Sequence, residues 1–365
     1  MEALALHEFH DGLNARFTEV NGTEVVNDYG NSMCEYMALH EAAGVLDLSF
    51  RSRICLTGVD RVRFLHGQVT NNVNTLRAGE GCYAALVTAK GKLQSDLNIY
   101  ALPNELLLDF EPGLIKTVSE RLDKYIIADD VQIVDVVSAY GLISIQGPKS
   151  ETVVRSIGLP LEIPTKALSF TSTNDPNLGE LYLVNQPRIG TIGFDLFVPT
   201  PALGAVMDKL IAAAKEQGGR ACGWQALELS RIEAGIPRFG ADMDEANLAP
   251  EAIEQQAISY SKGCYIGQEV IARIRTYGQV AKALRGLRLA EDLKSLPVKG
   301  DKLFHDGKEV GYITSATASP SLKSNIAFGY VRKEANQINT ELTLHTTEGD
   351  SSAKIVSLPF QSTVS

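Results

Sequence analysis

Hydrophobic and polar residues are ordered along the first two thirds of the chain in a way that predicts short strands and helices in turn. Residues 54–58 form an apolar run that ends at a glycine and predicts a strand, and residues 60–70 repeat their apolar positions with a helical period. Residues 83–102 predict a hairpin that turns at Lys90 and Gly91. Further strands are predicted at 106–110, 132–136 and 142–147, and a further helix at 114–126. Because long parallel strand–helix–strand units are missing from this pattern, it favours the α+β class.

Glycines mark the expected ends of two more helices. A helix over residues 32–43 is expected to stop at Gly44, and a helix over residues 203–217 is expected to stop at Gly218. The second helix carries an apolar stripe that consists of Leu203, Val206, Met207, Leu210 and Ile211. A continuous stripe of this kind indicates packing against a core, not a surface that holds a cofactor.

The last part of the chain has a different pattern. After Gly286 the helical signal fades, and short strand candidates follow one another between Gly, Pro and Ser turns, as in a small β-barrel. A chain of 365 residues also exceeds what one core usually holds. We therefore expect residues 1–285 to form two interlocked α+β subdomains and residues 286–365 to form a barrel, with a ligand cleft between packed units.

Charge narrows the classes of partner. The formal net charge of -10 and the pI near 5.2 give a surface that repels phosphate backbones, which argues against direct binding of nucleic acid. The densest basic stretch, residues 273–288, alternates with apolar residues and is more typical of the wall of a small anion site. Neither a signal peptide nor a run of ~18 to 20 apolar residues is recognisable, so we expect a cytoplasmic protein without membrane contact.

Cysteine and histidine spacing argues against metal sites and disulfides. The five cysteines are scattered, odd in number and without a CxxC pair, so a reducing compartment is expected and a disulfide framework is not. Apart from His7 and His10, the six histidines lack metal-ligand spacing, and no metal site is expected. GxGxxG and P-loop glycine patterns are also missing, which leaves dinucleotide and triphosphate cofactors without support.

The segment KGCYIGQE, residues 262–269, is the most informative stretch for chemistry. Lys262 beside Cys264, and a helix expected to start after Gly267, would both favour a thiolate. The two flanking glycines allow the backbone to approach a ligand closely or to adopt positive φ, which favours an exposed functional loop. The alternative is that Cys264 is a small buried hydrophobic residue, as most free cysteines are.

KGCYIGQE resembles the signature of folate-binding YgfZ-type proteins, which are relatives of the glycine cleavage T-protein (aminomethyltransferase). Other stretches are similar to the same superfamily, namely GVLDLSFRSRICLTGVDRVRFLHGQVTNNV, LISIQGP, LELSRIEAGIPRFGADMDEANLAPEA and VGYITSATASPSLKSNIAFGYV. Together they run from about Gly44 to about Val331. The resemblance implies a three-part cloverleaf around a central channel that holds tetrahydrofolate or a derivative, with a small C-terminal β-barrel.

The resemblance also implies roles for two carboxylates. RIGTIGFDLF is similar to the family segment that recognises the pterin, which assigns that role to Asp195; a carboxylate can accept two parallel N–H bonds from the ring edge. The alternative is a solvated residue at a strand edge. The loop is shorter here and lacks the family's Tyr-Thr-Gly-Glu-Asp run. GKLQSDLNIY matches the family's catalytic acid pair, but Ser95 replaces the first acid and only Asp96 is kept as a catalytic candidate beside Cys264.

Four more residues are folate-binding candidates through the resemblance. Arg231 matches a family arginine and would attract the glutamyl carboxylates, although an arginine near a glutamate on a helix is commonly a surface ion pair. Asn72, which follows Asn71 in QVTNNV, falls where the family has a Thr-Asn motif, and the alternative is a helix cap. Lys262 and Tyr265 of the signature segment complete the set.

Three functions are compatible with these residues. The leading hypothesis is a folate-binding accessory protein that acts on iron–sulfur client proteins in cluster assembly or repair, with the signature cysteine as its motivation. The alternative is a folate-dependent aminomethyltransferase that takes a one-carbon unit from an amine carried on a lipoyl carrier protein, motivated by Asp96. A partner in tRNA modification is the third, and the acidic charge opposes it.

Overall fold

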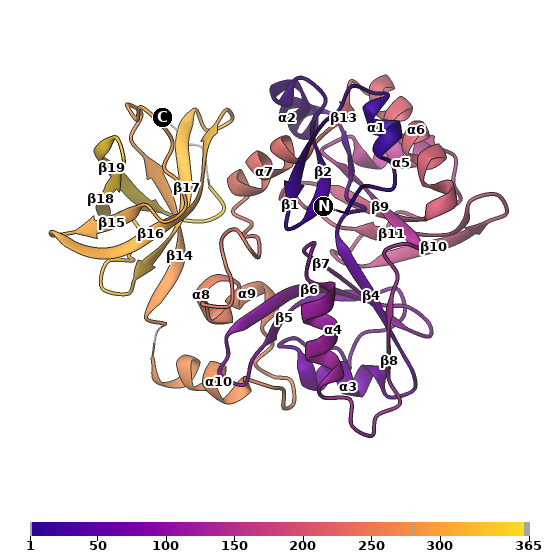
Figure 1. The fold of residues 1–365 in the computed structure, drawn as a ribbon, viewed down its shortest axis with the longest axis horizontal. Coiled ribbons are helices and arrows are strands. Elements are labelled where there is room, and N and C mark those ends of the chain that lie inside the picture. Colours follow the sequence, from indigo (N-terminus) through magenta and orange to yellow (C-terminus); the bar gives the residue numbers. More distant parts are fainter. Residues whose placement is uncertain (1, 279, 361–365) are drawn as a thin grey trace. The chain divides into compact units, whose positions relative to one another are not determined.

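The computed structural model describes residues 2–278 and 280–360 and divides the chain into two compact units (Figure 1). Unit 1 consists of Met1–Leu86, Gln94–Glu228 and Ser261–Tyr265, and unit 2 consists of Val87–Leu93, Leu229–Tyr260 and Ile266–Ser365. Each unit is therefore assembled from segments that are distant in the sequence.

A five-stranded sheet in unit 1 carries the first group of predicted strands. Its strands, in spatial order, are β5 (Gly81–Val87), β6 (Leu93–Ala101), β7 (Leu106–Phe110), β4 (Ser52–Thr57) and β8 (Gln132–Asp135). Helices α3 (Arg61–Gln68) and α4 (Ile115–Asp123) pack against this sheet. Leu65 of α3 and Val118 of α4 are fully buried in the same apolar cluster as Ile54 of β4, so burial of one helical face holds both helices in place.

A six-stranded sheet forms the rest of the core of unit 1. Its order is β10 (Phe170–Asp175), β11 (Gly179–Asn185), β12 (Gly193–Pro199), β9 (Tyr140–Gln146), β3 (Gly44–Asp47) and β13 (Arg220–Ala221). The other elements that begin in this unit are α1 (His7–Asp11), β1 (Arg16–Val20), β2 (Thr23–Asp28), α2 (Ser32–Glu41), α5 (Ser150–Ser156), α6 (Thr200–Glu216) and α7 (Trp224–Glu233). The apolar stripe of α6 is buried against this sheet, which confirms its predicted role as core.

Unit 2 contains a closed six-stranded barrel. The strands, in order around it, are β14 (Lys282–Leu289), β17 (Ser324–Arg332), β16 (Lys308–Ser319), β15 (Lys302–His305), β18 (Glu341–Thr346) and β19 (Gly349–Val356). Helices α8 (Ala249–Ala252), α9 (Glu254–Ala257) and α10 (Gln268–Tyr277) belong to the same unit. Leu287, Leu303 and Ile313 are among the residues that fill the barrel interior. The α+β class and the C-terminal barrel are thus confirmed.

One sequence prediction about a glycine is wrong. Helix α2 already ends at Glu41, and Gly44 is the first residue of β3 instead of a helix stop. A Cβ atom at Gly44 would lie 2.4 Å from Leu39 Cδ2 and 2.7 Å from Cys222 Sγ. Close packing of the strand therefore requires this glycine, which local sequence cannot reveal.

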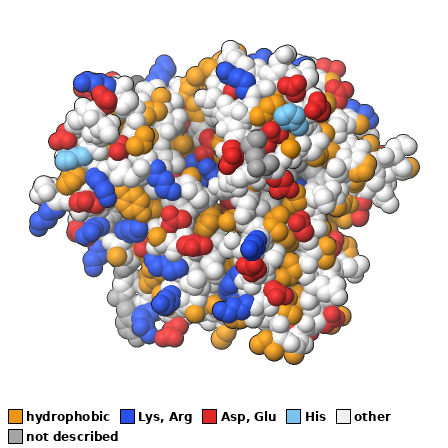
Figure 2. All heavy atoms as spheres, viewed as in Figure 1, with side chains coloured by type: hydrophobic (Ala, Val, Ile, Leu, Met, Phe, Trp, Pro, Cys, Tyr) orange, Lys and Arg blue, Asp and Glu red, His pale blue; other side chains and the backbone are white. Residues whose placement is uncertain are grey.

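The boundaries at the barrel differ from the pattern in two details. The opening strand β14 begins at Lys282, so the expected domain boundary at residue 286 lies inside a strand, and the division into two domains stays a prediction. The final strand β19 was not among the strand candidates, because residues 349–352 in its first half include no apolar side chain. Figure 2 shows acidic and basic side chains intermixed over the visible face. Over residues 2–278 and 280–360, the helices are too short or too polar to cross a bilayer.

Candidate functional site

Asp96 lies on β6 and accepts a hydrogen bond from Tyr83 on the neighbouring strand β5. The Tyr83 hydroxyl on β5 donates to Asp96 Oδ2 over 2.8 Å, whereas Oδ1 is buried and lacks a partner among the residues that the structure describes. Burial, followed by repulsion from Glu111, raises the pKa of Asp96 to about 6, although the Tyr83 bond opposes the shift. Asp96 therefore exchanges its proton near neutral pH and keeps one oxygen free to receive a ligand N–H group.

The two asparagines after α3 are linked to β5, the strand that carries Tyr83. Asn71 donates from Nδ2 to the Tyr83 carbonyl oxygen over 2.8 Å, and its Oδ1 accepts from the Asn72 N–H over 2.8 Å. Asn72 Oδ1 is buried and unpartnered within the described part of the chain. Asn71 thus fixes the turn after α3. Asn72, which the resemblance assigned to folate binding, keeps a buried oxygen that can accept a hydrogen bond.

A buried charge network lies on the neighbouring strand β7. Asp109 is completely buried and accepts hydrogen bonds from Arg51 Nε over 2.8 Å, Arg188 Nη2 over 3.2 Å and Asn98 Nδ2 over 3.1 Å. Burial alone would raise the pKa of Asp109, but the two arginine charges outweigh it and hold the pKa at about 2. Arg51 also donates from Nη1 to Glu111 over 2.6 Å, so the network reaches the group that repels Asp96.

Asp195 is joined to this network on β12, in the second sheet of unit 1. Its side chain is completely buried, so the alternative of a solvated strand-edge residue is wrong. Arg188, from the loop before β12, donates to both of its carboxylate oxygens. The proposed contact between Asp195 and a pterin therefore requires Arg188 to release at least one of these oxygens.

The signature segment contributes an exposed thiol and a buried lysine. Cys264 is exposed, as the prediction of an accessible loop required, and α10 begins directly after Gly267, as predicted. Lys262 is instead buried, and its ammonium group donates to the carbonyl oxygens of His66 over 2.5 Å and Val69 over 2.6 Å. Lys262 thus caps the C-terminal end of α3 and does not stand free beside the sulfur.

Burial governs the chemistry of the same segment. Burial lowers the pKa of Lys262 to about 8, and burial raises the pKa of Tyr265 to about 12. The Lys262 ammonium lies 4.7 Å from the centre of the Tyr265 ring, which is a cation–π contact. Burial also raises the pKa of the Cys82 thiol to about 12, so this thiol is uncharged at the pH where Lys262 loses its proton.

Arg231 belongs to unit 2 and is buried, so the alternative of a surface ion pair is wrong. Its guanidinium pairs with Asp242 and donates to Ser315 Oγ over 3.2 Å. Asp242 also accepts hydrogen bonds from Thr314 and Ser315 of β16. Arg231 therefore links the 229–260 segment to the barrel. Its role in folate binding stays a prediction.

Sequence reasoning missed Tyr83, Arg51, Arg188 and Asp109. A weak signal was present, since Asp109 interrupts the otherwise apolar strand LLLDF, and a charge inside a buried strand needs a partner. The partners come from distant parts of the chain, so only the fold identifies them. In unit 1 these contacts join the segments of Asn72, Asp96 and Asp195 into one polar region.

Comparison with known proteins agrees with this fold. Residues 6–262 match the GCVT N-terminal domain, and residues 282–361 match the glycine cleavage T-protein C-terminal barrel domain. The class is therefore that of the aminomethyltransferase fold with a C-terminal barrel. The chain belongs to the GCVT family.

Individual relatives are similar over nearly their full length. The chain is 26% identical over 359 residues to an aminomethyltransferase of Halalkalibacterium halodurans, covering 97% of this chain and 96% of the relative. It is 28% identical over 369 residues to an aminomethyltransferase of Symbiobacterium thermophilum, with 97% and 96% covered. The crystal structure of glycine cleavage system aminomethyltransferase T from Bartonella henselae superposes with a TM-score of 0.90 at 22% identity, over 99% and 98% of the two chains. That superposition shows a shared fold.

Proposed function

We propose that the protein is a folate-dependent transferase of the aminomethyltransferase type, which passes a one-carbon unit from an amine donor to tetrahydrofolate. The observation that carries the proposal is Asp96, with one oxygen held by Tyr83, the other buried without a partner, and a pKa of about 6. The names of the full-length relatives support the same reaction class. We prefer the transferase function to the accessory role because the transferase function gives the buried polar groups, Asp96 above all, a task in binding and proton transfer.

The residues of unit 1 fit a folate on the basis of their unpaired acceptors. Asp96 Oδ1 and Asn72 Oδ1 are both buried oxygens without described partners, and a buried acceptor of this kind is stabilised when a ligand N–H group reaches it. Bound tetrahydrofolate would supply the nitrogen atoms that accept a one-carbon unit. Asp195 is the further carboxylate proposed to hold the pterin edge.

Asp96 is proposed to hold and move the proton of the transfer at Oδ1. Tyr83 fixes the orientation of the carboxyl group through Oδ2, which leaves Oδ1 as the atom that exchanges a proton. Burial, followed by repulsion from Glu111, keeps the pKa of Asp96 high, so that Asp96 can be protonated and deprotonated within one cycle near neutral pH. A single carboxyl group therefore does not need the missing acid at Ser95 as its partner.

The test measures binding and turnover separately. Calorimetry with 5-formyltetrahydrofolate and ammonia release from an aminomethyl-loaded lipoyl carrier protein are compared for wild type, Asp96→Asn, Tyr83→Phe and the exposed control Asp208→Asn. We expect Asp96→Asn to lower turnover by about 10²- to 10⁴-fold while the protein stays folded, because it removes the proton carrier. Absence of both folate binding and turnover in the wild type would contradict the proposal.

A second candidate function rests on Cys264. Its exposed sulfur, in the segment that resembles folate-binding YgfZ-type proteins, supports an accessory role for iron–sulfur client proteins. The test compares Cys264→Ala with Cys34→Ala, a second exposed cysteine, for restoring cluster-enzyme activity in a deletion strain. Loss with Cys264→Ala alone supports the accessory role, and equal activity of both variants contradicts it.

A further inference from the structure

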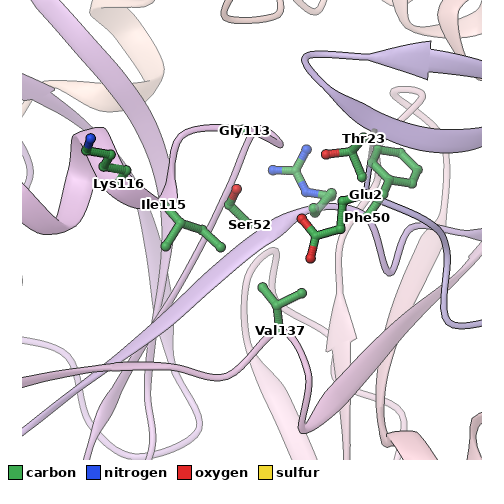
Figure 3. Close-up of a pocket in the computed structure, with 9 residues that line it drawn as sticks. Glu2, Thr23, Phe50, Ser52, Gly113, Ile115, Lys116 and Val137 are labelled. Atoms are coloured by element: carbon green, nitrogen blue, oxygen red, sulfur yellow. The ribbon is translucent and has the colours of Figure 1, made fainter.

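A small pocket in unit 1 shares Arg51 with the buried charge network and has the chemistry of an anion site. Its volume is about 220 Å³, and its lining residues come from the N-terminal segment, the β2 strand, the start of β4 and the first turn of α4. Figure 3 shows the Ser52 hydroxyl pointing towards Gly113, with the side chains of Ile115, Thr23 and Val137 around the same space. Apolar and polar side chains thus both line the pocket.

Two hydrogen-bond donors of the pocket, the Ser52 hydroxyl and Arg51 Nη2, have no acceptor among the described residues. Ser52 is 2% exposed, yet its hydroxyl forms no side-chain hydrogen bond among the described residues. Arg51 uses Nε and Nη1 on Asp109 and Glu111, so its second amino group, Nη2, keeps its donors without a described protein partner. Both groups line the pocket, so an anionic ligand there would accept hydrogen bonds from the Ser52 hydroxyl and from Arg51 Nη2.

Helix α4 adds a third source of donors. No side chain caps its start at Leu114, and its first turn contains no acidic residue, so the first amide groups and the positive end of the helix dipole remain available. Gly113 has φ of +76°, and a Cβ atom there would lie 2.5 Å from the Asn21 carbonyl oxygen. The turn between β1 and β2 therefore holds the start of α4 in place, which keeps these amides fixed beside the pocket.

Glu2 supplies an acceptor at the rim. Its N–H donates to the Gly22 carbonyl oxygen over 3.0 Å, and its carbonyl oxygen accepts from the Glu24 N–H over 2.9 Å, so its backbone is held on both sides. The carboxylate of Glu2 lines the same pocket as Ser52 and Lys116. A ligand with an anionic end and an ammonium or hydroxyl group next to it would match this arrangement.

We propose that this pocket binds a small organic carboxylate of the size of an α-amino acid. The carboxylate accepts from Ser52, Arg51 and the first amides of α4. The Lys116 ammonium group points away from Ser52 (Figure 3), so Lys116 adds positive charge only at longer range. The short carbon body contacts Ile115 and Val137, and Glu2 favours an amino acid over an acid without a second polar group. The pocket would give the protein a second ligand site, which has Arg51 in common with the polar network of the proposed folate site.

Nuclear magnetic resonance titrations with propionate, lactate and alanine, three acids that differ in one substituent, test the site in the absence of folate. We expect saturable binding of alanine, lost preference for alanine over propionate in Glu2→Gln, and about fivefold weaker binding of all three in Ser52→Ala. Ser52→Ala removes a hydroxyl without a partner in the fold, so the variant should stay folded. The exposed Ser172→Ala is its matched control.

Reversing the charge of Lys116 provides a second test of the proposed carboxylate site. Lys116 is exposed, so Lys116→Glu should fold, and its added negative charge should weaken alanine binding about tenfold at low salt, whereas the exposed control Lys166→Glu should not. Absence of saturable binding by all three acids, or equal binding by Ser52→Ala and wild type, would overturn the proposal. Displacement of alanine by 5-formyltetrahydrofolate would also overturn it, because the pocket would then be part of the folate site.

Discussion

Arg188 donates hydrogen bonds to both carboxylate oxygens of Asp195, over 3.1 Å to Oδ1 and over 2.5 Å to Oδ2. The pair is buried, and Arg188 also reaches Asp109 on the other sheet of unit 1. Asp195 thus has a structural partner in addition to its proposed role at the pterin. Stability and affinity measurements on the same variants can separate the two roles.

Removing one partner of this pair should destabilise the protein strongly. We expect Asp195→Ala to lower the free energy of unfolding by about 3 to 5 kcal/mol, because it leaves the Arg188 charge poorly compensated in the interior. The double variant Asp195→Ala/Arg188→Met removes both charges and should recover much of this loss, as measured by urea unfolding. If the recovered double variant binds 5-formyltetrahydrofolate as tightly as wild type, Asp195 does not hold the pterin.

Neutralising Asp109 should be as costly as removing the carboxylate of Asp195. It is completely buried between Arg51 and Arg188, so Asp109→Asn leaves two cations facing one amide, and we expect a loss of about 3 to 5 kcal/mol in unfolding free energy. Because its pKa is held at about 2, the stabilisation is present above the ordinary pKa of 3.8 and is lost as the pH falls through 2. Asp208→Asn should show neither effect.

The contribution of Asp96 to stability should depend on pH in the opposite direction from that of Asp109. Its pKa is raised to about 6, so the folded protein binds this proton more tightly than the unfolded chain does. Its favourable contribution is therefore present below pH 3.8 and is lost as the pH rises through 6. Denaturant unfolding at pH 4 and pH 7 should show wild type gaining up to about 3 kcal/mol relative to Asp96→Asn at the lower pH. An identical pH dependence of the two proteins would contradict the raised pKa.

Lys262 should act on stability through helix α3. Its ammonium group donates to two carbonyl oxygens at the end of that helix, so Lys262→Met is expected to cost about 2 to 3 kcal/mol in unfolding free energy. Lys166→Met, which changes an exposed lysine, is the matched control. Wild-type stability in Lys262→Met would mean that these bonds contribute nothing net.

Thiol labelling should distinguish the cysteines by burial. Cys34 and Cys264 are exposed, whereas Cys55 and Cys222 are buried, and burial raises the thiol pKa of both buried residues. We expect a disulfide reagent to modify the two exposed thiols of the native protein within minutes and the two buried thiols only after unfolding. Cys264→Ser should remove one rapidly reacting thiol, and an unchanged count would place Cys264 in a protected site.

The charged residues of unit 1 show where prediction from sequence fails. The strand LLLDF was predicted correctly, but its Asp109 finds partners at Arg51 and Arg188, which are 58 and 79 residues away in the chain. Pairing across such distances depends on which strands are neighbours, and local periodicity carries no information about that order. Lys262 is a similar case, because its partners His66 and Val69 lie in a distant helix end.

The amino-acid order by itself determined the kinds of element and the exposed signature loop. Apolar periodicity identified α6 and most of the barrel strands because burial of one face leaves a repeat in the sequence. The tertiary structure alone decided which polar side chains are paired. Asp195 accepts hydrogen bonds from Arg188, whereas Oδ1 of Asp96 has no hydrogen-bond partner among the described residues. The physical reason is that a buried charge is defined by its neighbours in space, and folding brings those neighbours from remote segments.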